Sequence, residues 1–312
     1  MLALLAPGQG AQTPGFLTPW IEDATSHALL QNWSSLIDLD LVRLGTLSDA
    51  DEIRETSHAQ PLLVAAGLIS AMQTFAGANI TFDYFAGHSV GEITAASLAQ
   101  SFDGDSALTL VNVRGRAMSV AAAGSNTGMS AVLGGERDVV VTALLALGLT
   151  PANENGGGQI VAAGDLAALA QLAENPPAGS RVRPLQVSGA FHTSVMQPAV
   201  TKLADAAREI TVVDPTAPVI SNRDGAIITN GDELMARIVG QVSGPVRWDL
   251  CMETLAAKGV TGVIEVAPGG TLTGLVKRAQ PGIELFAIKS PEDIEGAREF
   301  ARAHSGNKSG GQ

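Results

Sequence analysis

A serine flanked by two glycines, in Gly87-His88-Ser89-Val90-Gly91, constrains this chain more than any other feature. A short apolar run, 84–86, precedes it, and a stretch without a helix breaker, 92–100, follows it. We therefore expect a strand, a sharp turn and a helix, with the serine hydroxyl at the apex near the positive end of the helix. Glycines on both sides let the strand and the helix approach closely. The pattern favours a nucleophilic serine over a purely structural turn.

The composition is typical of a large globular α/β protein. The 312 residues are 46% hydrophobic and 16% charged, which is enough for a sizeable buried core. Short apolar runs alternate with Ala- and Leu-rich helical stretches, as in α/β folds with a mainly parallel sheet. No apolar run reaches about 18 residues, so no membrane partner is expected. The single cysteine, Cys251, excludes an intramolecular disulfide and fits a cytoplasmic location.

Charge and metal-binding residue types exclude two further classes. The formal net charge of −12 argues against nonspecific binding of nucleic acid. Five scattered histidines and one cysteine form no metal-ligand pattern, so no metal site is expected.

Residues 125–189 differ from their surroundings, because strand and helix patterns alternate there over about 60 residues. That length and order suit a small α+β unit inserted into a larger domain formed by 1–124 and 190–303. The polar, Gly-rich end, 304–312, is expected to be a disordered tail. Inside the unit we expect these elements: Met129–Leu133, Asp138–Leu147, Gln159–Ala163, Asp165–Ala173 and Val182–Val187.

A serine is a weak nucleophile until a base accepts its proton. The best candidate base is His192, which lies between a predicted strand and a predicted helix. His88 neighbours Ser89 in sequence but points elsewhere in a tight turn, so we interpret it as a pocket wall. No carboxylate lies in an obvious position to orient His192, and a backbone carbonyl can take that role.

Two further motifs suggest an acyl site for an anionic substrate. The loop 7–12 follows the first predicted strand, and one of its N–H groups, with that of Val90, could form an oxyanion hole. Arg114 lies on the otherwise apolar face of a predicted helix. A buried guanidinium needs an anionic partner, either an internal Asp or Glu or a substrate carboxylate.

Together these motifs resemble the malonyl-CoA:acyl-carrier-protein transacylases of fatty-acid synthesis, whose fold also serves as the acyltransferase domain of polyketide synthases. The matching motifs run from 8–12 to 265–272, nearly the whole chain. The resemblance implies a large hydrolase-like α/β domain with a ferredoxin-like subdomain at about 125–189. It also implies ping-pong transfer of malonyl from malonyl-CoA to the phosphopantetheine thiol of acyl carrier protein. CoA is the product, and no tightly bound cofactor is expected.

The resemblance also implies roles for individual residues. Ser89 becomes the acylated nucleophile, His192 its base and Arg114 the clamp on the malonyl carboxylate. The main-chain carbonyl of Gln241 would orient the histidine, and the backbone amides of Gln9 and Val90 would form the oxyanion hole. Gln60 and Asn155 match positions that line the family's pocket.

Other interpretations remain open at this point. A serine thioesterase or carboxylesterase would use the same Ser89 and His192 but would not need Arg114. A polyketide-pathway acyltransferase and a non-catalytic acyl-binding protein are further alternatives. An acidic carrier protein would need a basic docking patch on this acidic chain. The candidates are Lys277, Arg278, Arg181, Arg183, Lys202 and Arg208.

Phe191, directly before His192, predicts substrate selectivity. A bulky side chain here resembles the malonyl-selective pattern and would crowd the 2-methyl branch of methylmalonyl. One methyl group is worth about 1–3 kcal/mol of discrimination. We expect faster acylation by malonyl-CoA than by methylmalonyl-CoA, measured as the rate of adduct formation with each thioester. Equal rates would contradict this interpretation.

Overall fold

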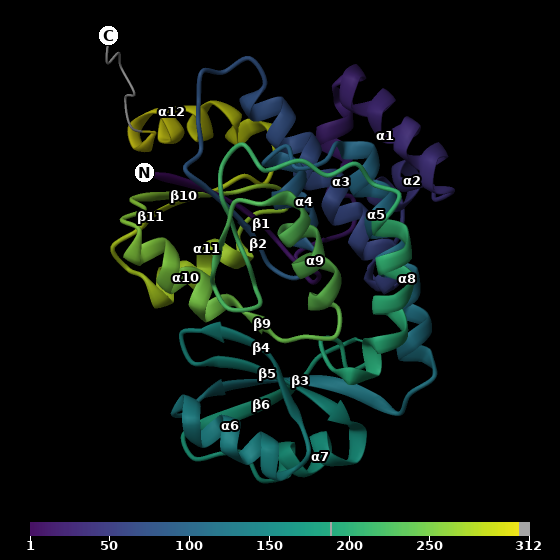
Figure 1. The fold of residues 1–312 in the computed structure, drawn as a ribbon, viewed down its shortest axis with the longest axis vertical. Coiled ribbons are helices and arrows are strands. Elements are labelled where there is room, and N and C mark those ends of the chain that lie inside the picture. Colours follow the sequence, from purple (N-terminus) through teal and green to yellow (C-terminus); the bar gives the residue numbers. More distant parts are fainter. Residues whose placement is uncertain (188, 306–312) are drawn as a thin grey trace.

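The computed structural model describes residues 1–187 and 189–305, and shows an α/β fold with two mixed sheets (Figure 1). Its strands are β1 Leu2–Ala6, β2 Tyr84–Gly87, β3 Thr127–Gly134, β4 Thr150–Gly156, β5 Gln159–Asp165, β6 Ser180–Pro184, β7 Val219–Ile220, β8 Ile227–Ile228, β9 Val246–Arg247, β10 Gly262–Glu265 and β11 Glu284–Ala287. Its α-helices are α1 Ala24–Ile37, α2 Leu41–Thr46, α3 Thr56–Phe75, α4 Gly91–Leu98, α5 Gly104–Ala123, α6 Arg137–Ala146, α7 Leu166–Glu174, α8 Gln197–Ala207, α9 Gly231–Gln241, α10 Trp248–Ala257, α11 Thr271–Ala279 and α12 Ile294–His304.

The larger sheet has the order β11-β10-β1-β2-β7-β8, with every neighbouring pair parallel except β7 and β8. Strand β1 is apolar throughout because it is covered on both faces. Its residues Leu2, Leu4 and Ala6 join the core formed with α3, α4 and α5, whereas Ala3 and Leu5 pack against α10 and α11. The parallel strands end at one edge, where loops can place functional groups.

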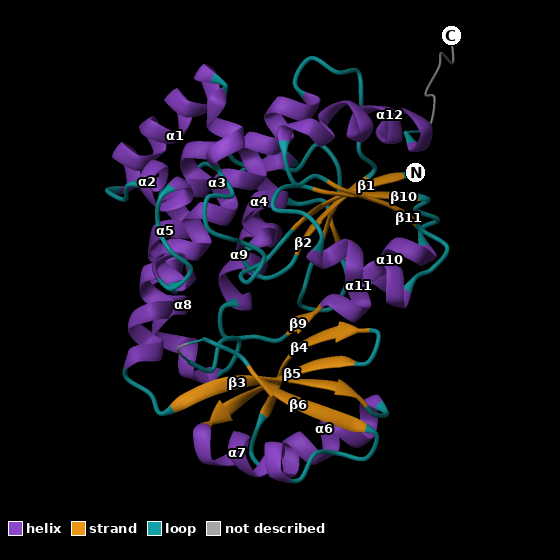
Figure 2. Ribbon diagram, turned by 180° about the vertical axis from the view of Figure 1, so that it is seen from behind, coloured by secondary structure: helices purple, strands orange, loops and turns teal. Residues whose placement is uncertain are grey.

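The smaller sheet has the order β6-β3-β5-β4-β9, and α6 and α7 cover one of its faces (Figure 2). Its first four strands are antiparallel and arise from the continuous segment 127–184 in the order βαββαβ. The fifth strand, β9, comes from much later in the chain and pairs in parallel with β4. This pairing joins the small sheet to the polypeptide that follows α9.

Two sequence predictions need correction. Strand β4 was absent from the prediction for the middle segment, because Asn153, Glu154 and Asn155 make it polar, yet all three side chains are buried. The sequence predicts a helix over Pro61–Phe75, whereas helix α3 starts at Thr56, so Pro61 lies inside the helix rather than at its first residue.

The end of the chain was expected to form a tail from residue 304. Helix α12 includes His304, and residues 306–312 lie outside the described residues.

Candidate active site

The serine turn is held by close backbone packing between β2 and α4. Ser89 has a backbone φ of 55°, in the left-handed region that non-glycine residues rarely adopt. A Cβ added at Gly87 would lie 2.0 Å from the carbonyl of Gly91, and one added at Gly91 would lie 2.2 Å from the carbonyl oxygen of Ala6. Only glycine fits at either position. The packing therefore lifts the Ser89 side chain away from the sheet.

Ser89 and His192 form a hydrogen-bonded pair, although 103 residues separate them. The Ser89 Oγ lies 2.8 Å from His192 Nε2, and His192 Nδ1 lies 2.9 Å from the backbone oxygen of Gln241. Since a carbonyl only accepts, Nδ1 carries the proton and the Nε2 lone pair faces the hydroxyl. Burial, and next the charge of Arg114, lower the pKa of His192 to about 3. The imidazole is therefore neutral at neutral pH and can accept a proton.

Arg114 of α5 lies directly behind the serine. It is 1% exposed and donates from Nη1 to Gln60 Oε1 at 2.7 Å. Its Nη2 donates to Ser89 Oγ at 3.1 Å and to Gln241 Oε1 at 2.9 Å. Burial lowers its pKa to about 10, which leaves the guanidinium charged at neutral pH. Within the described residues its hydrogen-bond acceptors are all neutral, so the charge remains available to an anionic ligand.

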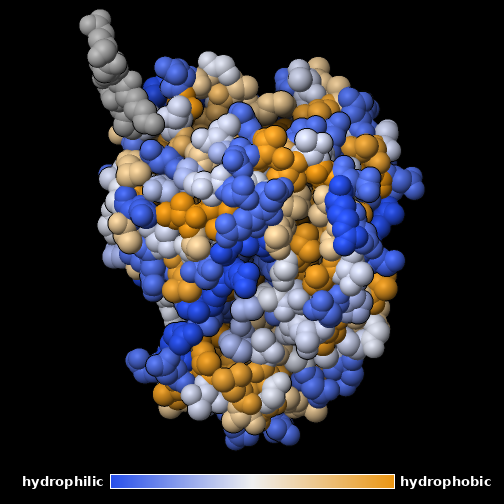
Figure 3. Space-filling view, in the orientation of Figure 1, coloured by the Kyte–Doolittle hydropathy of each residue, from blue (hydrophilic) through white to orange (hydrophobic). Residues whose placement is uncertain are grey.

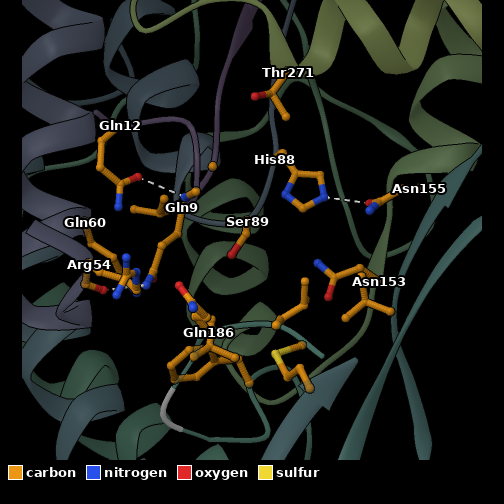
Figure 4. Close-up of a pocket in the computed structure, with 18 of the residues that line it drawn as sticks. Gln9, Gln12, Arg54, Gln60, His88, Ser89, Asn153, Asn155, Gln186 and Thr271 are labelled. Atoms are coloured by element: carbon orange, nitrogen blue, oxygen red, sulfur yellow. Dashed lines mark hydrogen bonds between the residues drawn. The ribbon is translucent and has the colours of Figure 1, made fainter. Parts of the chain in front are cut away.

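The pair opens into a cavity of about 610 Å³, with Ser89 at its centre (Figure 4). Among the predicted site residues, Gln9, Gln60, His88, Ser89, Val90, Asn155, Phe191 and His192 all line it. Arg114 and Gln241 do not line this cavity and reach it through their hydrogen bonds to Ser89. The cavity lies between the carboxyl edge of the large sheet and the small sheet, because residues of both contribute to its walls.

His88 forms a polar part of the cavity wall. Its Nε2 lies 2.8 Å from Asn155 Oδ1, and its ring meets Trp248 edge-on. Burial lowers the pKa of His88, so the ring is neutral. Since Asn155 belongs to β4, this contact ties the serine turn to the small sheet.

The loop after β1 is held by its own side chains. Gln9 Nε2 donates to the carbonyl of Arg54 at 3.3 Å, and the Gly10 N–H donates to Gln12 Oε1 at 2.9 Å. Across residues 1–187 and 189–305, the backbone N–H groups of Gln9 and Val90 have no protein acceptor. Both residues border the cavity beside Ser89, which leaves these two donors for a ligand.

Sequence reasoning missed two residues of the site. Asn222 Oδ1 accepts the Ser89 N–H at 2.7 Å, and Asn222 Nδ2 donates to the Gly87 carbonyl at 2.8 Å. Glu92, 1% exposed, accepts the Asn222 N–H at 2.6 Å. The signal that could have found Asn222 is its position just after the β-branched pair Val219-Ile220, which forms β7 and ends at the same sheet edge as Ser89. The only sequence signal for Glu92 was its position in the first helical turn after the serine motif.

The described part of the chain contains no cluster of three or more side chains suited to holding a metal ion. No helix among those residues has the length and hydropathy needed to cross a bilayer.

A half-buried turn serine, a neutral histidine and a buried arginine beside one cavity are the features of a serine-dependent acyl-transfer site. Residues 5–289 match the family described as "Acyl transferase domain". The chain is 48% identical to the malonyl CoA-acyl carrier protein transacylase of Mycobacterium tuberculosis H37Rv over 300 residues, covering 95% of this chain and 98% of that one. Against the enzyme of the same name from Escherichia coli K12 the identity is 34% over 312 residues, with coverages of 96% and 99%.

Solved structures agree with the sequence comparison. The crystal structure of the Mycobacterium tuberculosis transacylase superposes with a TM-score of 0.91 at 48% identity, covering 96% of this chain and 99% of that chain. A malonyl-transacylase solved in complex with a type II PKS acyl-carrier protein gives a TM-score of 0.89 at 28% identity, with coverages of 96% and 99%. The chain therefore belongs to the acyl transferase family, within the group of malonyl CoA-acyl carrier protein transacylases.

The glycine requirement of the turn is testable with Gly91→Ala. The added Cβ meets a main-chain oxygen that cannot move aside, so we expect a loss of at least about 1–3 kcal/mol in the free energy of unfolding. The reaction of Ser89 with a fluorophosphonate probe should also slow. Gly124→Ala is the matched control, because a Cβ there has no neighbour within 4 Å. Equal stabilities and labelling rates of the two variants would refute the close-approach argument.

Proposed function

We propose that this protein transfers the malonyl group from malonyl-CoA to the phosphopantetheine thiol of acyl carrier protein through a malonyl-Ser89 intermediate. The observation that carries the proposal is the direct contact of Ser89 Oγ with both a neutral base, His192, and a charged guanidinium, Arg114. A base activates the nucleophile, and a fixed cation selects an acyl group that has its own carboxylate.

In the first half-reaction, His192 Nε2 accepts the Ser89 proton while Oγ attacks the thioester carbonyl. The negative charge on the carbonyl oxygen is stabilised by the N–H groups of Gln9 and Val90. The tetrahedral intermediate then collapses, the C–S bond breaks, and the imidazolium returns its proton to the sulfur of CoA. The backbone carbonyl of Gln241 holds the imidazole in the tautomer that both proton transfers need.

In the second half-reaction, the carrier's phosphopantetheine thiol gives its proton to His192 and attacks the malonyl ester. The C–O bond to Ser89 then breaks, and the serine recovers its proton from the imidazolium. Nucleophile, base and cation all come from side chains, so this route needs no tightly bound cofactor. We place the activity in the cytoplasm, where the buried free Cys251 stays reduced.

The finer architecture is part of the same proposal. Residues 1–124 and 190–303 would form a hydrolase-like domain, and 125–189 a ferredoxin-like subdomain. The βαββαβ order with strands arranged β6-β3-β5-β4 supports the second assignment. The subdomain supplies Asn155 as one cavity wall, whereas Phe191, 6% exposed, lines another wall next to the base.

The direct test is the intact mass of the protein after brief incubation with malonyl-CoA, followed by addition of holo acyl carrier protein. We expect a malonyl adduct that is absent in Ser89→Ala and that moves to the carrier. An adduct lost to water before the carrier is added would instead indicate a thioesterase. Absence of any adduct at concentrations that bind the thioester would contradict the role of Ser89.

The proposed carboxylate clamp predicts a change in acyl selectivity. Arg114→Met keeps the aliphatic bulk but removes the charge-assisted hydrogen bonds, each worth about 1.5–3 kcal/mol. We expect the ratio of acylation rates for malonyl-CoA over acetyl-CoA to fall by at least about 10-fold, measured by adduct mass. A hydrolase of neutral esters would keep its turnover in this variant. Arg114→Lys keeps a charge but lacks the planar fork, so its ratio of acylation rates should lie between those of the wild type and Arg114→Met.

A docking surface for the carrier is suggested by the basic residues beside the cavity. Arg278 of α11 borders both the main cavity and a second hollow of about 660 Å³, which Arg181 of β6 also lines. Arg183 lies on the same strand as Arg181, and Lys277 precedes Arg278 on α11; all four are exposed. Lys202 lies instead on α8, which packs against α5, and Arg208 directly follows that helix and pairs with Asp205. On the face drawn in Figure 3, a hydrophilic band runs from the middle of the molecule to the small sheet.

If this surface binds the carrier, Arg181→Glu should slow transfer of malonyl to acyl carrier protein but leave acylation by malonyl-CoA intact. The charge reversal replaces attraction to an acidic partner with repulsion, and the effect should shrink as ionic strength rises. Arg208→Glu, directly after α8, is the matched control and should transfer at the wild-type rate. Transfer rates that do not depend on salt would refute electrostatic docking.

A further inference from the structure

Glu92 is a carboxylate buried directly beneath the reactive serine. It belongs to the first turn of α4 and is 1% exposed. It accepts the backbone N–H of Asn222 at 2.6 Å and a hydrogen bond from Gln241 Nε2. Within the described residues no Lys or Arg pairs with it directly. A buried charge held only by neutral donors is costly, so its retention needs an explanation.

Through Asn222, the carboxylate supports the strained turn. The Asn222 side chain bridges the Ser89 N–H and the Gly87 carbonyl, which lie on either side of the turn. The Asn222 backbone is in turn held by Glu92. The position of the nucleophile therefore depends on an acceptor at Glu92.

Through Gln241, the same carboxylate orients the base and the cation. Gln241 directs its amide nitrogen to Glu92 and to the Ser89 carbonyl, its amide oxygen to Arg114, and its backbone oxygen to His192. An ionised carboxylate only accepts, so the Gln241 side chain must present nitrogen to it and oxygen to Arg114. A protonated or amide group at position 92 could place a donor against that nitrogen. The amide would then turn and set its nitrogen against the guanidinium.

We propose that Glu92, in its ionised form, is a positioning residue that holds Asn222 and Gln241, and that its protonation turns off acylation of Ser89. This inference rests on the proposed function, because it concerns the same serine. The Glu92 carboxylate touches none of the reacting groups and acts only through the Asn222 backbone and the Gln241 side chain that it holds.

The titration behaviour of the site supports the inference. Burial raises the pKa of Glu92 to about 7, against the opposing effects of the Asn222 amide and the charge of Arg114. The other charged or titratable groups that face it are Arg237 of α9 and Cys251 of α10. His192, with a pKa of about 3, remains neutral over the same range. A loss of activity near neutral pH would therefore come from Glu92 rather than from the base.

Stability and activity should respond to pH in opposite directions. Between about 4.5 and about 7 the folded protein binds the Glu92 proton more strongly than the unfolded chain does. The contribution of Glu92 to the free energy of unfolding therefore falls as the pH rises through that window. Acylation should rise over the same window. A side chain with a purely structural role would not make the free energy of unfolding and the acylation rate change in opposite directions with pH.

The test compares the rate of malonyl-Ser89 formation in the wild type and in Glu92→Gln as a function of pH. We expect the wild-type rate to fall as the pH drops through about 7. The variant should be on the order of 100-fold slower above that pH, as expected for a misplaced reacting group, and should lack the acid limb. Its Tm at alkaline pH should equal or exceed the wild-type value, because an unfavourable buried charge is gone.

Glu265→Gln is the matched control. Glu265 is also a buried carboxylate, but it accepts hydrogen bonds from Gly270, Leu272 and Thr273 at the start of α11. This variant should lose Tm and keep the acid limb of the wild type. An unchanged acid limb in Glu92→Gln, or a wild-type rate, would overturn the inference.

Two results separate this inference from the proposed function. A wild-type protein that forms no malonyl adduct contradicts the proposed function itself. If Glu92→Gln does not fold, infrared titration of the wild type decides: a protonated-carboxyl band should vanish as the pH rises through about 7, in parallel with the gain in rate. A gain in rate without that change would overturn the role of Glu92.

Discussion

The left-handed backbone of Ser89 is the constraint on which the site depends. A non-glycine residue in such a conformation costs of order 1–3 kcal/mol and persists only where the surroundings enforce it. Here the enforcement comes from two glycines that bring β2, α4 and the end of β1 within van der Waals limits, and from Asn222 across the turn. The strain is useful because it presents the hydroxyl to a cavity while the serine backbone stays within the packed core.

A buried positive charge is the second constraint. Arg114 is fully enclosed, yet it donates only to neutral oxygens of Gln60, Gln241 and Ser89. Such an arrangement keeps the guanidinium in place and leaves its positive charge able to pair with the carboxylate of a ligand. Because Gln241 contacts Arg114 through its side chain and His192 through its backbone, displacement of one residue would move both the cation and the base.

The small sheet contributes more than a wall to the cavity. Strand β9 follows α9 closely in sequence and pairs with β4, so the segment that carries Gln241 is tied to the small sheet. Asn155 of β4 bonds to His88 beside the nucleophile. Glu154 on the same strand forms ion pairs with Arg137 and Arg247. The cavity geometry is therefore shared between the two sheets through buried polar contacts.

Several of these features could be predicted from local patterns. The glycine-flanked serine predicted the turn between β2 and α4, and helical periodicity placed Arg114 on the inner face of α5. Strand β4 was missed because its buried residues Asn153, Glu154 and Asn155 are polar, whereas sequence-based prediction relies on the apolar pattern of an ordinary strand. The candidate basic residues lie in two places, at and near the hollow lined by Arg181 and Arg278, and on or just after α8. The number of charges in the sequence does not reveal this separation.

By itself, the sequence determined the α/β class, the serine turn and the inward face of Arg114, because these depend on interactions between residues close together in the chain. Only the tertiary structure decided which groups surround the serine. Asn222 lies 133 residues and His192 103 residues from Ser89, and Glu92 reaches Gln241 across 149. Such partners are chosen when parallel strands end at one edge and bury their loops together, since burial then requires each polar group to find a complementary one.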